Sequence, residues 1–235
     1  MRRQIIGMGG GGFSMEPDNP VMDRYILEQS GRPRPKVCFL AGASGDDEGY
    51  IRGFLDAFGR LDCRPSCLRL ASLPAEGAEA FLLSQDVIYV GGGDTHRLMR
   101  GWREAGIDGI LRRAWEAGIV LAGLSAGSIC WFEEGITDLE EGVFDRVEGL
   151  GLIPGSHCPH YNGCGWQEGY RRMIASGGLG AGLALTDGAA AHYAAEDGSE
   201  EPVALLRIVG SRPEARAYRL GGEGDEHELP VELLR

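Results

Sequence analysis

The chain has 235 residues, of which 43% are hydrophobic and 25% charged, and its formal net charge is −12 at pH 7. A charge of this sign repels phosphate backbones, and no dense cluster of lysine and arginine offsets it, so nucleic acid is not an expected partner. No run approaches the roughly 20 apolar residues that a membrane span requires, and the glycine-rich N-terminus lacks the apolar core of a secretion signal. We therefore expect one cytoplasmic globular domain, residues 1–235, that does not contact a membrane.

Apolar, strand-like runs alternate with helical patterns along the first half of the chain. A buried strand running into a glycine loop is expected at residues 4–13, with further strands at 36–42, 67–70, 86–90 and from 119 into the motif at 123–127. Helices are expected at residues 21–29, 50–61, 75–83, 95–105 and 106–117. Strands about 30 residues apart with helices between them are typical of a doubly wound, mostly parallel α/β sheet with helices on both faces.

Glycine loops end three of these strands, near Gly12, Gly93 and Gly123. In parallel sheets, chemistry gathers beyond the carboxyl ends of the strands, and glycine lets a backbone approach a ligand closely. The first loop does not open directly into a helix, as a dinucleotide-binding loop would, and we interpret it as a flexible or substrate-lining loop.

The second half of the chain is expected to add a loop that carries two histidines. The acidic residues 133–141 are interpreted as a turn region, and an apolar strand then leads into the loop with His157 and His160. A helix is expected at residues 168–174 and a strand at 182–189, and residues 190–235 are interpreted as an antiparallel extension of the sheet.

Ser125 stands in a Gly-x-Ser-x-Gly pattern between an apolar strand and helical residues. A sharp strand-to-helix turn brings positions 123 and 127 together, which requires small residues there, and it holds the serine strained and exposed as a nucleophile elbow. The amide of Ala126 would open the helix and face developing negative charge. The same pattern also fits a plain glycine-rich loop, so the motif does not decide alone.

A serine hydroxyl needs a neighbouring base, and the chain offers five histidines. They are His96 just inside a helix, His192 and His227 in the late ribbon, and His157 and His160 on one loop. Placement beyond a strand end, shortly after the serine motif, favours His160 as the base.

The six cysteines are scattered, several of them in apolar runs, which is typical of reduced thiols in a cytosolic protein. Cys158 and Cys164 flank His160, so a zinc site has to be considered, but the paired Cys-x-x-Cys spacing of zinc sites does not occur. No metal or organic cofactor is expected.

Three motifs occur in an order and at separations that resemble the peptidase E family of serine peptidases, relatives of cyanophycinase. They are GGGDT at residues 91–95, GLSAGS at 123–128 and PHYN at 159–162, and the resemblance spans roughly residues 35–190. It implies a flavodoxin-like sheet, akin to class I glutamine amidotransferases, and a Ser–His–acid triad that hydrolyses dipeptides or short peptides at the N-terminal residue.

The resemblance also implies roles for individual residues. Ser125 would be the nucleophile and His160 the general base, and the amides of Gly92, Gly93 and Ala126 would form the oxyanion hole. Asp94, Tyr161, Tyr170 and Arg171 would lie against the substrate.

The acid of the triad is placed by the resemblance in a Thr-x-Asp-like turn after the nucleophile helix. Asp138, which follows Thr137, is the nearest counterpart and is our prediction. Glu133, Glu134 and Asp187 stay open as alternatives, because each lies at the end of an expected element.

Substrate preference is where the chain departs from the family pattern. Family members that cleave after an N-terminal aspartate hold its carboxylate with an arginine in the helix after the histidine motif, where this chain has Tyr170. A tyrosine cannot reproduce the bidentate fork of a guanidinium. Either a neighbouring arginine, Arg171 or Arg172, takes that role, or a different N-terminal residue is preferred.

Two other classes of function stay open. An esterase of the α/β-hydrolase type would complete its triad with Asp187 and His227, an order that this fold allows. A non-catalytic flavodoxin-like module would use the glycine loops to hold a small anion. Association of the chain into a homo-oligomer and its physiological substrate are left open.

Overall fold

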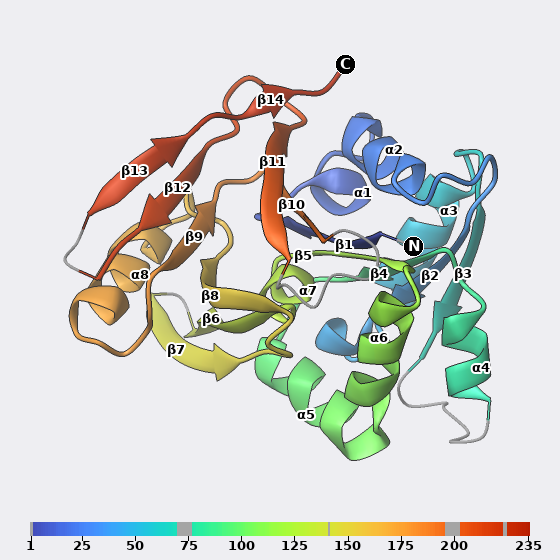
Figure 1. The fold of residues 1–235 in the computed structure, drawn as a ribbon, viewed down its shortest axis with the longest axis horizontal. Coiled ribbons are helices and arrows are strands. Elements are labelled where there is room, and N and C mark those ends of the chain that lie inside the picture. The colour runs from blue at the N-terminus through green and yellow to red at the C-terminus, as the bar shows by residue number, and fades with distance from the viewer. Residues whose placement is uncertain (1, 70–76, 141, 196–202, 223–224) are drawn as a thin grey trace.

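The computed structural model describes residues 2–69, 77–140, 142–195, 203–222 and 225–235, and two β-sheets organise this part of the chain (Figure 1). The larger sheet has eight strands in the order β14-β11-β10-β1-β5-β4-β2-β3. These strands are Arg3–Met8 (β1), Lys36–Leu40 (β2), Arg64–Leu68 (β3), Val87–Val90 (β4), Val120–Leu124 (β5), Ala189–Ala195 (β10), Ala204–Gly210 (β11) and Glu232–Leu233 (β14).

The five strands from β1 to β3 in this order pair in parallel, so their carboxyl ends lie at one edge of the sheet. The strand β10 pairs with β1 in the antiparallel sense and begins the extension towards β11. The expected mixed α/β fold is confirmed, including a parallel core with an antiparallel extension.

Helices cover both faces of this sheet. They are Gly12–Met15 (α1), Val21–Glu28 (α2), Glu48–Phe58 (α3), Ala78–Leu83 (α4), Thr95–Ala105 (α5), Ile107–Glu116 (α6) and Ala126–Ile129 (α7), with a 3-10 turn at Gly42–Ser44. Alternate residues of β4 enter two different cores: Val87 and Tyr89 pack with α1 to α3, while Ile88 and Val90 pack with α4 to α7. Figure 1 accordingly shows the first set above the sheet and α5 and α6 below it.

A second, six-stranded sheet was not predicted. Its order is β13-β12-β9-β8-β6-β7, with strands Phe132–Glu140 (β6), Val143–Glu148 (β7), Ile153–Cys158 (β8), Gly182–Leu185 (β9), Ala217–Leu220 (β12) and Glu226–Leu229 (β13). The helix Trp166–Ala175 (α8) packs against it. The interpretation of residues 133–141 as a turn region was therefore wrong, because most of this acidic stretch is strand β6, in which the buried residues 135–137 are flanked by mostly charged residues that are exposed or half-buried.

The late ribbon divides between the two sheets: β10, β11 and β14 extend the larger sheet, whereas β12 and β13 belong to the smaller one. Positions 70, 75 and 141, which bound three of the expected elements, lie outside the described residues, as do 196–202 and 223–224 within the expected ribbon.

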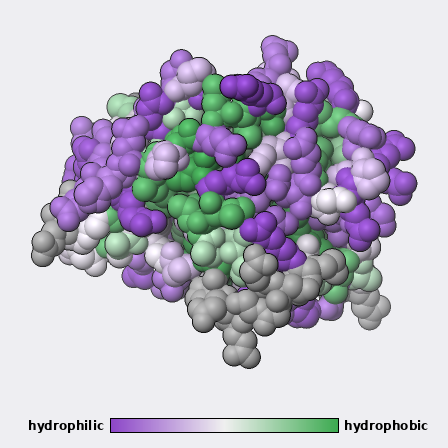
Figure 2. All heavy atoms as spheres, turned by 45° about the horizontal axis from the view of Figure 1, so that its top comes forward, coloured by the Kyte–Doolittle hydropathy of each residue, from purple (hydrophilic) through white to green (hydrophobic). Residues whose placement is uncertain are grey.

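Figure 2 shows hydrophilic side chains around the rim of one face and hydrophobic ones gathered towards its middle. Such mixing is ordinary for a protein surface, because there is not enough polar surface to cover a folded chain. Within the described ranges, no helix has the length and apolar character needed to cross a membrane.

Candidate active site

Ser125 connects β5 to α7 through a sharp turn. Its backbone has φ 55° and ψ −118°, and positive φ occurs at three non-glycine residues of the described chain: Asp46, Ser125 and His160. Such a conformation costs on the order of 1–3 kcal/mol and persists only where the surroundings impose it. Two of the three positions are thus the predicted nucleophile and the predicted base.

The two glycines of the motif are required by close backbone contacts. A Cβ added at Gly123 would lie 2.1 Å from the carbonyl oxygen of Gly127, and one added at Gly127 would lie 2.2 Å from that of Val90. Contacts this short do not occur at real Cβ atoms. The turn after β5 can therefore form only with glycine at both positions.

His160 is oriented by a carboxylate. Its Nδ1 lies 2.6 Å from Oδ1 of Asp187, so the ring donates there and keeps Nε2 for another partner. The side chain of Asn162 holds the same aspartate twice, because its Nδ2 donates to Oδ2 (3.1 Å) and its Oδ1 accepts from the Asp187 amide (2.8 Å).

Burial alone would raise the pKa of the Asp187 carboxyl, but the hydrogen bond and charge of His160, the amide of Asn162 and the charge of Arg212 together hold it below its ordinary value. The carboxylate is therefore ionised at neutral pH, and it can stabilise a positive charge on the imidazole.

The end of strand β1 brings the serine and histidine segments together. The amide of Ser125 donates to the carbonyl oxygen of Met8, and the amide of His160 donates to that of the next residue, Gly9, each over 3.1 Å. The first glycine loop continues along this site, because a Cβ at Gly10 would lie 2.1 Å from Oδ1 of Asp187 and 2.8 Å from Cε1 of His160. The loop thus forms a close wall beside the imidazole–carboxylate pair.

Asp138, the predicted acid, lies elsewhere. It is an exposed residue of β6 opposite Phe144 on β7, and the carboxylate that contacts His160 belongs to Asp187. The reason is the order of the smaller sheet: β9 pairs in parallel with β8, so the residues after both strands emerge at the same edge. The position of Asp187 directly after a strand was the sequence signal for it.

The other two acidic alternatives are engaged on the smaller sheet. Glu133 accepts a hydrogen bond from the amide of Gly155 (2.7 Å). Glu134 accepts one from the amide of Gly180 (2.7 Å) and forms an ion pair with Arg146. Neither carboxylate contacts His160.

The amides of the predicted oxyanion hole differ in their availability. Ala126 is the first residue of α7, so its N–H has no acceptor within the helix. Gly93 is exposed and has φ 135°, and within the described chain its N–H has no hydrogen-bond partner. Gly92 is different, because its N–H donates to the hydroxyl of Tyr50 (3.1 Å). Within the described chain, the N–H groups of Ala126 and Gly93 are thus without a backbone acceptor, whereas that of Gly92 is engaged.

The predicted substrate contacts are mostly engaged within the protein. Asp94 caps α5 by accepting from the amide of Arg97 (2.9 Å). Tyr161 is buried and donates its hydroxyl to Glu226 (2.8 Å), which also forms an ion pair with Arg171. These side chains thus hold the fold around the site.

Tyr170 is completely buried and was wrongly expected at the surface of the substrate pocket. Its hydroxyl lies 2.7 Å from Oγ of Ser156 inside the core between α8 and the smaller sheet. The residue corresponding in sequence to the family's arginine therefore faces the core.

Tyr170→Phe is expected to lower the free energy of unfolding by about 1 kcal/mol, because one buried hydrogen bond is lost while Ser156 keeps the carbonyl of Gly180 as an acceptor. The KM for peptides should stay within about twofold of the wild-type value. Urea unfolding and steady-state kinetics on the purified variant measure both, and a KM raised about tenfold would instead place the hydroxyl on the substrate.

The remaining histidines do not contact Asp187. His227 is exposed on β13, His96 pairs with Asp145, and His192 is buried between Tyr25 and Gln4. The esterase alternative, which needed Asp187 with His227, is therefore not supported, because Asp187 is already bonded to His160.

The described residues also give no support to a zinc site. Cys158 is buried and Cys164 exposed, and in the described ranges no group of three His, Cys, Asp or Glu side chains is arranged to hold a metal ion.

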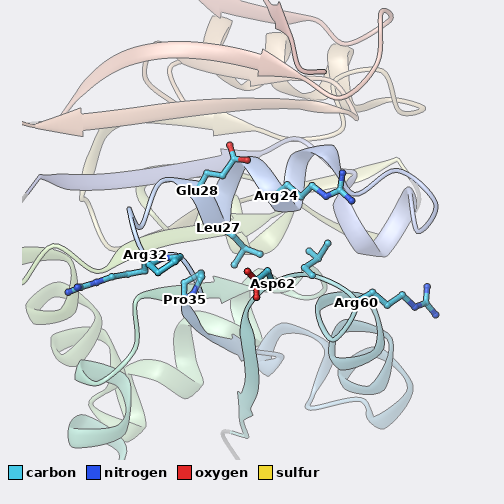
Figure 3. Close-up of a pocket in the computed structure, with 9 residues that line it drawn as sticks. Arg24, Leu27, Glu28, Arg32, Pro35, Arg60 and Asp62 are labelled. Carbon is cyan, nitrogen blue, oxygen red and sulfur yellow. The ribbon is translucent and has the colours of Figure 1, made fainter.

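Two surface hollows lie at opposite edges of the larger sheet. The one in Figure 3, about 360 Å³, is lined by Arg24, Arg60 and other residues around the amino ends of β2 and β3, so it lies far from the strand ends that carry Ser125. A groove of about 450 Å³ adjoins the carboxyl ends instead, between the 3-10 turn and α5, with Arg97 and Arg100 on its wall. The second hollow therefore lies on the same edge as the glycine loop that contains Gly93.

Fold and site together define a mixed α/β protein with a serine, a histidine and an aspartate brought to one end of its sheets. The chain belongs to peptidase family S51, whose family model matches residues 5–200. It is 48% identical over 238 residues to the uncharacterized peptidase YgaJ of Bacillus subtilis strain 168, covering 99% of both chains. The resemblance to peptidase E is thereby confirmed.

Solved structures support the fold. A peptidase from an acI-B1 actinobacterium has a TM-score of 0.70 at 18% identity, covering 97% of this chain and 94% of that one. A putative peptidase E protein from Listeria monocytogenes EGD-e has a TM-score of 0.62 at 18% identity, covering 88% of this chain and all of that one.

Proposed function

We propose that this chain is a serine exopeptidase that hydrolyses dipeptides or short peptides at their N-terminal residue, with Ser125 as nucleophile, His160 as general base and Asp187 as the acid. Membership of peptidase family S51 supports the reaction class. The observation that carries the assignment of roles is the 2.6 Å contact between His160 Nδ1 and Asp187 at the strand ends where Ser125 makes its strained turn.

The chemistry follows from these positions. His160 Nε2 accepts the hydroxyl proton as Ser125 Oγ attacks the scissile carbonyl carbon, and Asp187 stabilises the imidazolium that forms. The amides of Gly93 and Ala126 bind the oxyanion. The imidazolium then donates its proton to the leaving amine, the C–N bond breaks, and water attacks the acyl-enzyme with His160 again as base.

We further propose that the chain does not depend on an N-terminal aspartate. Tyr170 is buried where the family pattern has its arginine, and Arg171 is held by Glu226. A guanidinium already paired with a carboxylate would have to give up that pair to bind a substrate carboxylate. We also assign the fold to the flavodoxin-like class, on the order and parallel sense of β1 to β5.

Ser125→Ala is expected to lower kcat by about 10⁶-fold, because the nucleophile is lost and its base has nothing to activate. Hydrolysis of N-terminal Asp, Glu and neutral dipeptides should vanish, as should labelling by a fluorophosphonate probe. Mass spectrometry of the labelled wild type should locate the adduct on Ser125.

Ser176→Ala is the matched control, since Ser176 is exposed at the end of α8 and should leave both readouts unchanged. Labelling or hydrolysis that persists in Ser125→Ala would contradict the proposed function, and a wild type that never labels would favour a binding module.

A further inference from the structure

A second serine–histidine pair lies buried behind the first. The Oγ of Ser128 is 2.8 Å from Nε2 of His157, and Nδ1 of His157 is 2.9 Å from the carbonyl oxygen of Leu183. Both polar side chains are fully buried. Because a carbonyl only accepts, Nδ1 carries the proton, and Nε2 accepts from the Ser128 hydroxyl.

The three members of this buried chain stand close in sequence to the three members of the proposed triad. Ser128 follows Ser125 by three residues, and His157 precedes His160 by three. Leu183 lies on β9, whose last residue comes two positions before Asp187. His157 therefore belongs to the segment that carries the base, and its ring forms hydrogen bonds with the segments that carry the nucleophile and the acid.

His157 cannot itself act as a base. Burial lowers the pKa of its imidazole to about 3, so the ring is neutral at neutral pH. The ring stacks on Phe132 with centroids 4.5 Å apart and planes 8° apart. A fully buried, stacked ring does not reach a substrate, and its role must pass through other residues.

The segment that needs support is the short helix α7. It has four residues, too few to be stable alone, and it follows the strained backbone of Ser125. The amide of Ser128 donates to the carbonyl oxygen of Ser125 (2.8 Å), so whatever fixes Ser128 also fixes the turn. On its other side Ser128 is confined by β1, where a Cβ at Gly7 would lie 2.5 Å from its Oγ.

We propose that His157 is a positioning residue that holds the nucleophile turn, the base loop and the acid strand in register through its hydrogen bonds to Ser128 and Leu183. The inference rests on the proposed triad and deepens it: the smaller sheet carries base and acid, the larger sheet carries the nucleophile, and this imidazole joins the two.

Two substitutions separate the two hydrogen bonds. An asparagine amide places its polar atoms near the Nδ1 position, so His157→Asn keeps the bond to Leu183 and loses that to Ser128. A glutamine reaches the Nε2 position, so His157→Gln keeps Ser128 and loses Leu183. Each variant therefore releases a different segment of the triad.

Release of the nucleophile turn in His157→Asn is expected to slow fluorophosphonate labelling and kcat by about 10- to 100-fold, because a displacement near 1 Å has an effect of this order. KM should stay within about twofold. Release of the acid strand in His157→Gln should move the acid limb of the kcat/KM pH profile, where Asp187 is protonated, to higher pH, because its carboxyl loses the hydrogen bond and charge of His160 that help to hold its pKa down.

His192→Asn is the matched control. His192 is also fully buried and uses both ring nitrogens, with Tyr25 (2.6 Å) and Gln4 (3.1 Å), but its partners carry no member of the triad. It should destabilise the fold with kcat, KM and the pH limb unchanged, when all variants are assayed well below their unfolding temperatures.

Ser128→Ala, a smaller change, should reproduce the slowed labelling of His157→Asn even if the histidine variants fold poorly. The positioning role would be overturned if Ser128→Ala and the folded His157 variants had the same kcat, labelling rate and pH profile as the control His192→Asn. Labelling that persists in Ser125→Ala would instead contradict the proposed function, so the two failures are distinguishable.

Discussion

Asp187→Asn is expected to lower kcat by about 10⁴-fold while leaving the fold intact. The carboxylate accepts the Nδ1 proton of His160 and thereby keeps Nε2 free to receive the proton of Ser125. An asparagine amide can present an N–H to Nδ1, which favours the tautomer with its proton on Nε2, and it cannot stabilise the imidazolium. Steady-state hydrolysis of the preferred dipeptide measures the effect.

The matched control is Asp138→Asn, which changes the residue that sequence analysis predicted as the acid. Asp138 is exposed on β6 and faces Phe144, so its loss should leave kcat within about twofold of wild type. If Asp138→Asn proved as damaging as Asp187→Asn is expected to be, the acid of the triad would have to be reassigned.

The ionisation of Asp187 predicts how kcat/KM depends on pH. Because the pKa of the Asp187 carboxyl is held below its ordinary value, the carboxylate stays ionised through the pH range in which imidazole titrates. Protonation of Asp187 should therefore reduce kcat/KM only at pH values below the ordinary range of an aspartate carboxyl, and this acid limb should be absent from the residual activity of Asp187→Asn.

Gly123→Ala is expected to lower the free energy of unfolding by about 3 kcal/mol, because the added methyl group would overlap a backbone atom. That atom, the carbonyl oxygen of Gly127, would be 2.1 Å from the new Cβ and cannot yield, since Gly127 itself packs against the backbone of Val90. Urea unfolding measures the loss, and labelling of the folded fraction should also fall as Ser125 is displaced.

Gly53→Ala is expected to change the free energy of unfolding in the opposite direction. Gly53 is an exposed residue of α3, and a Cβ there would meet no atom within 4 Å. The substitution should stabilise the protein by about 0.5–1 kcal/mol, as expected for alanine replacing glycine in a helix. A Gly123→Ala protein as stable as wild type would mean that the turn has another conformation in solution.

Local pattern was enough for much of the larger sheet. The apolar run of β5, its two glycines and the helical residues after Ser125 are contiguous in sequence, and the same holds for β4 and the glycine loop that follows it. Such features depend on residues close together in the chain, which is why the parallel α/β core and the position of Ser125 were predictable.

The errors all concern residues brought together from distant parts of the chain. The burial of Tyr170 depends on α8 packing against strands that come before and after it, and the helix pattern alone does not say which face is covered. The acidic residues of β6 were taken for a turn because their charged side chains resemble those of a polar loop, whereas pairing with the strands β7 and β8 makes this stretch a strand.

By itself, the sequence determined the family of the chain, its parallel α/β core and the strained serine turn, and it pointed to His160 as the proposed base. Only the tertiary structure decided that Asp187 is the partner of His160 and that His157 joins both sheets. The physical reason is strand order: β8 and β9 are separated by α8 in the chain, and their parallel pairing, which no local pattern encodes, brings the residues after them to one edge.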